Sequence, residues 1–196
     1  MSARRILVIQ GHPDPAGGRL CHALAAAYVE GARAAGHEVR LVDIAPLDFP
    51  LLRSQADWEH GRVPPALAAV QQDLLWTQHL VLVFPLWMGD MPALLKGFIE
   101  QVARPGLNGE VPAGGAMPPK ALKGRSARVV VTMGMPAVVY RWYFRAHSLK
   151  SLERNILGMV GIAPVHETLI GLVDRLGEAG VAKWLAKLRR LGREAA

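Results

Sequence analysis

The sequence has one cysteine and no long apolar run. The single cysteine, Cys21, excludes an intrachain disulfide and a metal site built from cysteines. No apolar run approaches the roughly 20 residues that cross a bilayer, and residues 6–9 form too short a run for the core of a signal peptide. We therefore expect a protein of the reducing cytoplasm.

The signatures of several common enzyme classes are also missing. Neither G-x-G-x-x-G nor a Walker A motif is present, so a resident nicotinamide site of the Rossmann type and a P-loop NTPase lack support. Without H-E-x-x-H or an acidic triad we expect no metal site, and without G-x-S-x-G no serine hydrolase. Cys21 lies at the start of a helix with an apolar stripe, which argues against a catalytic thiol.

Acidic residues are fewer than basic ones, 16 Asp and Glu against 23 Lys and Arg, which gives a net charge of +7. Such an excess suits an anionic ligand, an acidic surface or nucleic acid. The basic side chains form no stripe with interleaved aromatic residues, so we expect no nucleic-acid partner. The densest basic cluster lies in the final segment, at Lys183, Lys187, Arg189, Arg190 and Arg193. Apolar spacing there predicts a docked helix with a solvated basic face, and peripheral membrane attachment is the minority alternative.

The 196 residues, 51% of them hydrophobic, are enough for one domain over 1–196 with a substantial core. Apolar runs predict strands at 4–10, 37–43, 80–84, 127–132 and 163–170. Helical spacing predicts helices at 20–35, 65–76, 93–103, 148–160 and 175–193, with loops at 44–63, 104–124 and 133–147. This alternation is typical of an α/β three-layer sandwich, and five strands fit the flavodoxin-like order 2-1-3-4-5. In that order ligands bind beside strands one and three, at the carboxyl ends of the strands.

The loop after the first strand, residues 11–19, precedes a helix. A helix N-terminus offers free N–H groups and partial positive charge, which suits a phosphate. Gly17 and Gly18 permit close backbone approach, and Arg19 could add a charged contact. The alternative is a plain turn in which Asp14 or a glycine caps the helix. His12 is either a phosphate donor or a polar loop residue.

The loop after the third strand, residues 85–92, is the most informative stretch of the chain. Pro85 and Pro92 bracket it, and each fixes its own φ, so the backbone there is stiff. Trp87 and Met88 can present backbone N–H groups and flat apolar surface to a planar ring. The alternative is an ordinary connection with Trp87 in the core.

The loop after the fourth strand combines small and aromatic residues. Thr132 and Gly134 can offer backbone N–H groups to a ring. Tyr140, Tyr143 and His147 are donors that could stabilise negative charge on a ring oxygen. Core or dimer packing is the alternative for the aromatic cluster.

Three motifs follow strands: G-H-P-D-P at 11–15, F-P-L-W-M-G-D-M-P-A-L-L-K-G-F at 84–98 and V-T-M-G-M-P at 131–136. Together they resemble the NAD(P)H-dependent quinone reductases of the flavodoxin-like fold, the DT-diaphorase family. The resemblance covers nearly the whole chain, and the second motif is the most specific. It implies a bound flavin, FMN or FAD, and a homodimer with the site at the subunit interface.

The resemblance assigns the phosphate end of the site. The family's first-loop histidine matches His12. The helix start that holds the flavin phosphate, usually S-F-N, falls here at Gly18, Arg19, Leu20 and Cys21. Arg19 is a plausible substitute for the missing contacts.

The resemblance also assigns the ring end. The backbone that holds the isoalloxazine edge matches Pro85, Leu86, Trp87, Met88 and Gly89, with Met88 in place of the usual second aromatic residue. The family's T-T-G-G matches in part Thr132, Met133, Gly134 and Met135. The residues that assist charge on the ring match Tyr140 and His147, and Tyr143 competes with Tyr140.

The function implied by the resemblance is an enzyme that reduces quinones, or similar flat electrophiles, by two electrons in a ping-pong reaction. NADH or NADPH would be a transient hydride donor. Two alternatives remain: a flavodoxin-like electron carrier, and a redox-sensing regulatory subunit of a membrane transporter.

Overall fold

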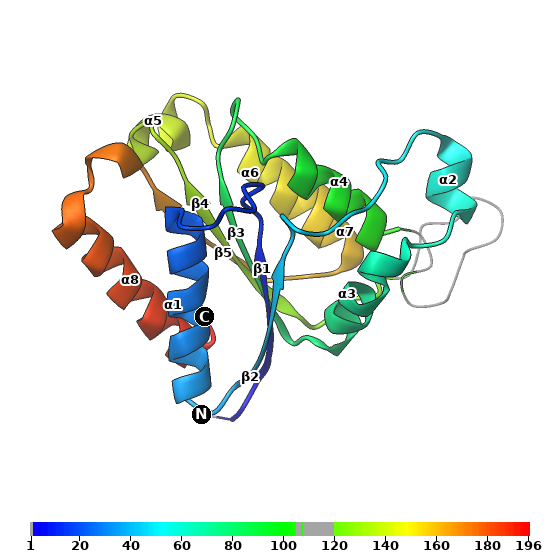
Figure 1. Cartoon of the computed structure of the whole chain (residues 1–196), viewed down its shortest axis with the longest axis horizontal. Coiled ribbons are helices and arrows are strands. Elements are labelled where there is room, and N and C mark those ends of the chain that lie inside the picture. The colour runs from blue at the N-terminus through cyan, green and yellow to red at the C-terminus, as the bar shows by residue number, and fades with distance from the viewer. Residues whose placement is uncertain (1, 105–106, 108–119) are drawn as a thin grey trace.

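A parallel sheet of five strands forms the centre of the molecule, between two layers of helices (Figure 1). The structure is a computed structural model that describes residues 2–104, 107 and 120–196. The strands are β1 (Arg5–Gln10), β2 (Glu38–Asp43), β3 (His79–Pro85), β4 (Ser126–Thr132) and β5 (Val165–Ile170). All neighbours pair in parallel in the order β2-β1-β3-β4-β5, so the predicted sandwich and its strand order are confirmed. Most of the loop predicted over 104–124 lies outside the described residues.

The central strand, β3, is buried along its whole length. Leu80, Leu82 and Phe84 point into one core, whereas Val81 and Val83 point into the other. This division follows from the period of two along a strand, with helices covering both faces of a parallel sheet. The end of β3 is therefore a fixed point from which the loop 85–92 starts.

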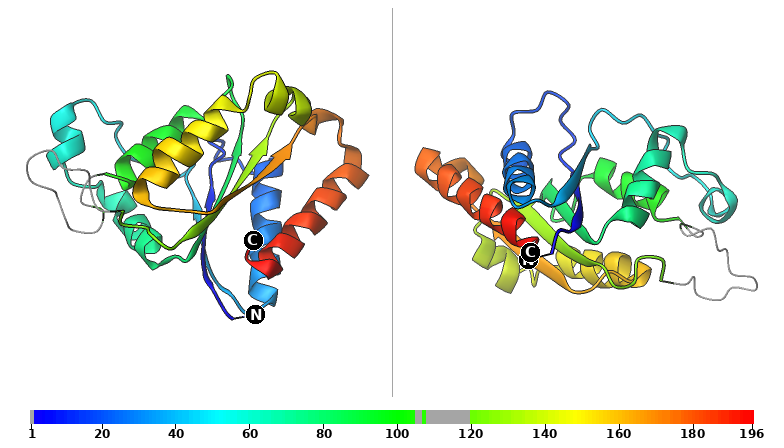
Figure 2. Two further views of the ribbon diagram at one scale, coloured as in Figure 1. Left: turned by 180° about the vertical axis from the view of Figure 1, so that it is seen from behind. Right: turned by 90° about the horizontal axis from the view of Figure 1, so that it is seen from below.

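Helices α1 (Leu20–Ala34) and α8 (Gly177–Glu194) cover one face of the sheet (Figure 2). The other face carries three helical segments: α3 (Pro65–Trp76), α4 (Ala93–Val102), and α6 (His147–Ser151) with its continuation. That continuation is a π-helical segment, η2 (Leu152–Leu157), followed by α7 (Gly158–Val160). All five predicted strands and all five predicted helices are confirmed to within two residues at their ends.

Two short helices lie in segments that the sequence predicted as loops. Helix α2 (Gln55–His60) buries none of its residues, and its N-terminus is capped by Ser54, whose hydroxyl accepts the N–H of Asp57 at 3.1 Å. Helix α5 (Ala137–Trp142) buries only Tyr140. Each helix has only 6 residues and buries at most one of them, which is too little to produce the helical periodicity on which the prediction depends.

The C-terminal helix docks as predicted. Leu188 and Leu191 of α8 are buried against the core beside α1. On its polar side, Arg189 pairs with Glu30 of α1 at 2.7 Å. Among the described residues, we find no helix of the length and apolarity needed to cross a membrane.

Candidate active site

The three loops that carry the sequence motifs meet at the carboxyl edge of the sheet. The N–H of Leu86 donates to the carbonyl of Thr132 at 2.7 Å, which joins the second loop to the third. The rings of His12 and Trp87 lie edge to face with centroids 5.7 Å apart, which joins the first loop to the second. Cys21 Sγ lies 3.2 Å from Thr132 Oγ1, which ties the start of α1 to β4. We call the region formed by residues 11–22, 85–92 and 132–135 the cradle.

The first loop has two consecutive left-handed residues before α1. Gly17 and Gly18 have φ values of +71° and +70°, and a Cβ at either position would meet no atom within 4 Å. Arg19 occupies the N-cap position, and no side chain caps the helix there. The first N–H groups of a helix have no partner inside the helix, so they are available to an anion.

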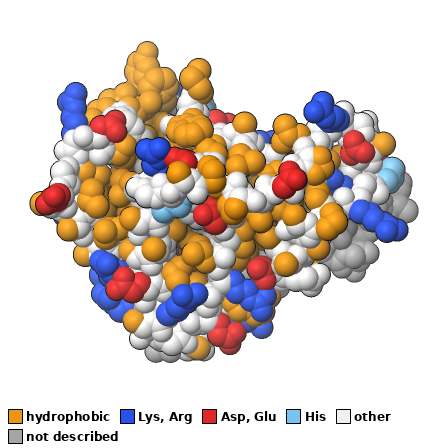
Figure 3. Space-filling model, viewed as in Figure 1, with side chains coloured by type: hydrophobic (Ala, Val, Ile, Leu, Met, Phe, Trp, Pro, Cys, Tyr) orange, Lys and Arg blue, Asp and Glu red, His pale blue; other side chains and the backbone are white. Residues whose placement is uncertain are grey.

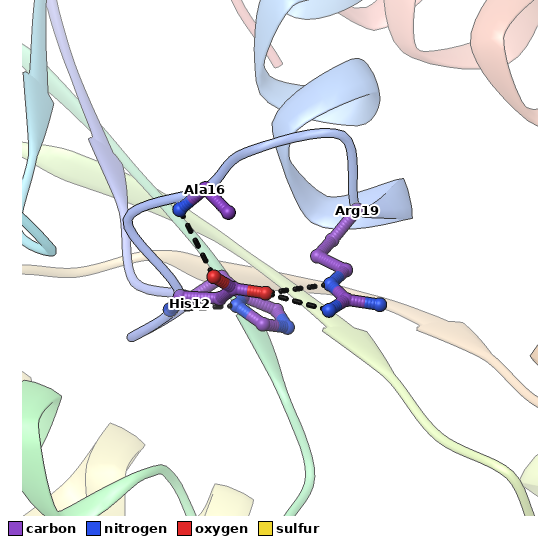
Figure 4. A network of polar contacts seen from close by, with 4 residues as sticks. His12, Ala16 and Arg19 are labelled. Atoms are coloured by element: carbon purple, nitrogen blue, oxygen red, sulfur yellow. Dashed lines mark hydrogen bonds and ion pairs between the residues drawn. The ribbon is translucent and has the colours of Figure 1, made fainter.

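Arg19 already holds an anion within the protein (Figure 4). Its Nε and Nη2 atoms lie 2.8 Å and 2.7 Å from Oδ2 of Asp14. The N–H of Ala16 donates to the same carboxylate, and this bond together with Arg19 lowers the pKa of Asp14. Sequence reasoning considered Asp14 only as a possible helix cap and missed its pairing with Arg19, although an acid five positions before an arginine, across a Gly-Gly turn, was a usable signal.

His12 is a neutral donor at the centre of the cradle. Burial, and next the neighbouring His22, lower the pKa of His12, so its ring is uncharged at neutral pH. Its Nδ1 accepts the N–H of Asp14 at 3.1 Å, which places the proton of the neutral ring on Nε2. Gln10, a second residue that sequence reasoning missed, accepts the backbone N–H of His12 through its side chain.

His22 is the third residue that sequence reasoning missed. Its ring centroid lies 5.5 Å from that of His12. Both ring nitrogens are buried, and neither has a hydrogen-bond partner in the described part of the chain. Such orphaned groups are costly in a finished core and are consistent with a site completed by a polar ligand.

The second loop is a tight hairpin turn. Trp87 and Asp90 exchange both backbone hydrogen bonds, at 2.8 Å and 2.9 Å. The residues between them, Met88 and Gly89, have φ values of +49° and +83°, which is the pattern of a type I′ turn. Met88 at the tip is fully exposed, and Trp87 is 49% exposed, so Trp87 is not the core residue of the alternative interpretation.

Several cradle N–H groups that the sequence assigned to a ligand are already used. Leu86 donates to Thr132, Trp87 to Asp90, and Met133 to Ile170. In the described second and third loops of the cradle, the N–H groups of Met88, Gly89, Gly134 and Met135 have neither a backbone nor a side-chain acceptor. Pro85 closes β3 and has no N–H to give.

Cys21 and Thr132 are bonded to each other rather than facing outward. Both side chains are buried, and burial raises the pKa of Cys21 to about 11, so its sulfur stays protonated. Only the backbone of Cys21 and of half-buried Leu20 can contribute to an anion site.

The structure places Tyr140 inside the protein. This side chain is only 2% exposed, and its hydroxyl lies 2.8 Å from Oγ of Ser148 and accepts the N–H of Leu149. Its hydroxyl is therefore used inside the protein, where α5 packs on α6. Tyr143, which is 79% exposed, and His147, also exposed, remain available for contacts with a ligand.

The sequence profile of the flavodoxin-like fold matches residues 4–191. The chain belongs to the flavodoxin-like family. In this flavodoxin-like protein β1 pairs with β3, although the two strands are not consecutive in the sequence. The strand order reverses there, and this switch point of the fold is where the cradle lies.

Curated relatives match this flavodoxin-like chain over part of their length. A ribosyldihydronicotinamide dehydrogenase-like protein of Penicillium crustosum is 27% identical over 155 residues, which are 66% of this chain and 57% of the relative. An uncharacterized NAD(P)H oxidoreductase of Escherichia coli K12 is 31% identical over 117 residues, 55% of this chain and 56% of the relative. The chain thus spans just over half the length of these two relatives.

Among solved structures, an NAD(P)H:quinone oxidoreductase from Methanothermobacter marburgensis has the same fold. It superposes with a TM-score of 0.78 at 21% identity and covers 98% of this chain and 96% of its own.

Proposed function

We propose that this flavodoxin-like protein is a flavin-dependent NAD(P)H oxidoreductase that passes two electrons to quinones or similar flat electrophiles. The observation that carries the proposal is the meeting of the three loops at the switch point, where half-exposed Trp87 lies beside His12. The dehydrogenase and oxidoreductase names of the two curated relatives support the same reaction class.

The cradle fits a flavin at both ends. At the phosphate end, the open Gly17-Gly18 turn and the uncapped start of α1 suit an anion. Arg19 would hold the phosphate in place of the Asp14 carboxylate, and the orphaned nitrogens of His22 would fit a polar group close by. When bound, the flavin supplies the ring that accepts and gives up electrons.

The chain's own residues position the rings and donate hydrogen bonds. Trp87 offers a flat face, and the N–H groups of Gly134 and Met135 donate to polar atoms at the edge of a ring. The Nε2–H of His12 donates without carrying a charge. Tyr143 and His147 supply the donors that stabilise negative charge on the ring or the substrate.

We also propose that two copies pair across the cradle. Exposed apolar side chains gather at the top edge of the molecule in Figure 3, where α5 and the hairpin turn after β3 lie. Met88 in the hairpin turn and Tyr143 just after α5 are 104% and 79% exposed. A patch of this kind on a protein surface marks an interaction site, and a second copy would cover it.

The decisive experiment is to release and identify the bound flavin. We expect a yellow preparation with about one flavin per chain, and chromatography of the released cofactor separates FMN from FAD. Stopped-flow mixing with NADH or NADPH should bleach the flavin quickly, and a quinone should restore its colour. A colourless protein that takes up neither flavin contradicts the proposal, and slow reduction by free nucleotide would favour an electron carrier.

A matched pair of variants tests the assignment of the catalytic tyrosine. Tyr143→Phe is expected to slow flavin reduction roughly 10-fold to 100-fold with unchanged stability, because it removes an exposed donor to developing charge. Tyr140→Phe removes the buried bonds to Ser148 and Leu149, so it should cost about 1 kcal/mol of stability and leave the rate unchanged. Stopped-flow rates and thermal melts measure the two effects. The opposite result would return the role to Tyr140.

A further inference from the structure

A second concavity, separate from the cradle, lies beside the edge strand β5. Its volume is about 830 Å³, and its walls come from β4, β5, α5, α6 and η2. None of its lining residues belongs to the cradle. We propose that it binds a nucleotide-type ligand, with a planar ring on Trp142 and phosphoryl groups on Arg145 and Lys150.

The charge of the concavity favours an anion. Four cationic side chains line it, Arg128, Arg141, Arg145 and Lys150, against two carboxylates, Glu153 and Glu167. Arg141 and Glu167 form an ion pair with each other. Among the described residues, no carboxylate lies within ion-pair distance of Arg145 or Lys150, so both can hold a ligand's charge.

Arg128 is a buried cation in the lining of the concavity, and its side chain is held in place by hydrogen bonds. It is only 8% exposed, and its Nη1 donates to Oγ1 of Thr168 at 2.8 Å, while its Nε donates to the carbonyl of Ala196. A guanidinium held in this way provides positive potential that does not depend on a flexible surface side chain.

The remaining lining suits a planar ring. Trp142 is 75% exposed, and the apolar side chains of Ala146, Leu149 and Val165 line the same concavity. An exposed indole can stack on a heteroaromatic base, and neighbouring cations then bind the phosphoryl oxygens. The volume lies within the roughly 300–1,000 Å³ of small-molecule sites.

Two departures from regular backbone border the concavity. Arg145 and Ala146 are consecutive non-glycine residues with φ values of +55° and +49°, a conformation that costs energy for residues with a Cβ. Glu153 lies in the π-helical segment η2, an element that is rare and often marks functional sites. The presence of both irregular backbone segments beside the same charged concavity supports the proposal that the concavity binds a ligand.

The test is the binding of ADP to the full chain with its flavin, measured by calorimetry at low salt. We expect saturable binding at one site per chain. The double variant Arg145→Gln/Lys150→Gln should weaken it by about tenfold or more, because it removes two charge-assisted contacts. The control Lys183→Gln/Lys187→Gln, with the same loss of charge on the exposed side of α8, should leave it unchanged. Trp142→Ala should weaken ADP but not inorganic pyrophosphate.

The ligand could be a free nucleotide or the adenylate half of the NAD(P)H donor, because both carry a base and phosphoryl groups. The assignment to the donor rests on the proposed function. If the donor is the source, ADP competes with NADH, and the double variant raises KM for NADH but not for a reduced nicotinamide riboside. If the source is a free nucleotide, ADP binds without competing. Absence of ADP binding, or equal binding by the double variant, overturns the proposal. Flavin content is recorded in parallel, so a failed flavin site is recognised separately.

Discussion

Replacing Gly192 with alanine is expected to lower the free energy of unfolding by about 3 kcal/mol. The added methyl group would overpack a contact with backbone atoms, which cannot turn away as a flexible side chain can. Helices α1 and α8 approach each other at two glycines. A Cβ on Gly192 would lie 2.1 Å from the carbonyl oxygen of Tyr28, and a Cβ on Gly31 would lie 1.9 Å from that of Arg189. The atoms in the way belong to main chain, so the helices must move apart.

Thermal and urea unfolding measure the effect, with the melting temperature expected to fall by about 6–12 °C. Gly180→Ala is the matched control, because Gly180 lies in the same helix. Its Cβ would meet the Leu176 side chain, at 3.2 Å from the nearest atom, and that side chain can turn away. This control should be neutral or stabilising, since alanine favours a helix. Equal melting temperatures for the two variants would contradict the close approach.

Gly18→Val is expected to weaken flavin binding by at least about tenfold, because a β-branched residue disfavours positive φ by 1–2 kcal/mol or more. The Gly17-Gly18 turn has two left-handed residues in succession, and it sets the direction from which the chain enters α1. A valine there shifts the backbone N–H groups away from a phosphate. Fluorescence titration of the flavin-free protein with FMN and FAD measures the loss.

Gly36→Val separates this effect from general destabilisation. Gly36 has a φ of +81°, and a Cβ there, as at Gly18, meets no atom within 4 Å. It follows α1 at the opposite end of that helix from the cradle. Both variants should lose similar stability, but only Gly18→Val should lose flavin. If Gly36→Val loses as much flavin, the first loop does not hold the phosphate.

The sheet and its main helices could be predicted because their signals are local. The sequence of β3 is a continuous apolar run because both faces of the strand are buried. The sequence of α1 has a stripe of apolar residues because only one side of the helix packs against the sheet. The short helices α2 and α5 bury almost nothing, so their formation depends on a cap or on one tyrosine. A pattern based on burial cannot detect such elements.

The position of the cradle could be predicted from the sequence, but the hydrogen-bond partners of its residues could not. Strand order brings the loops of β1, β3 and β4 together, so His12 and Trp87 could be placed in one site from topology. Which hydrogen-bonding groups of the cradle are already paired within the protein depends on side-chain torsion angles, and the spacing of residues in the sequence does not reveal these angles. The Tyr140 hydroxyl points into α6, and the Arg19 guanidinium turns to Asp14.

The bond between Cys21 and Thr132 has a practical consequence. The only sulfhydryl of the chain is buried and protonated at neutral pH, so it is a poor nucleophile toward alkylating reagents. A cysteine introduced at Met88, on the fully exposed tip of the hairpin turn, would then be the preferred labelling position. A dye attached there could report the arrival of a ligand or a second copy without removal of the natural cysteine.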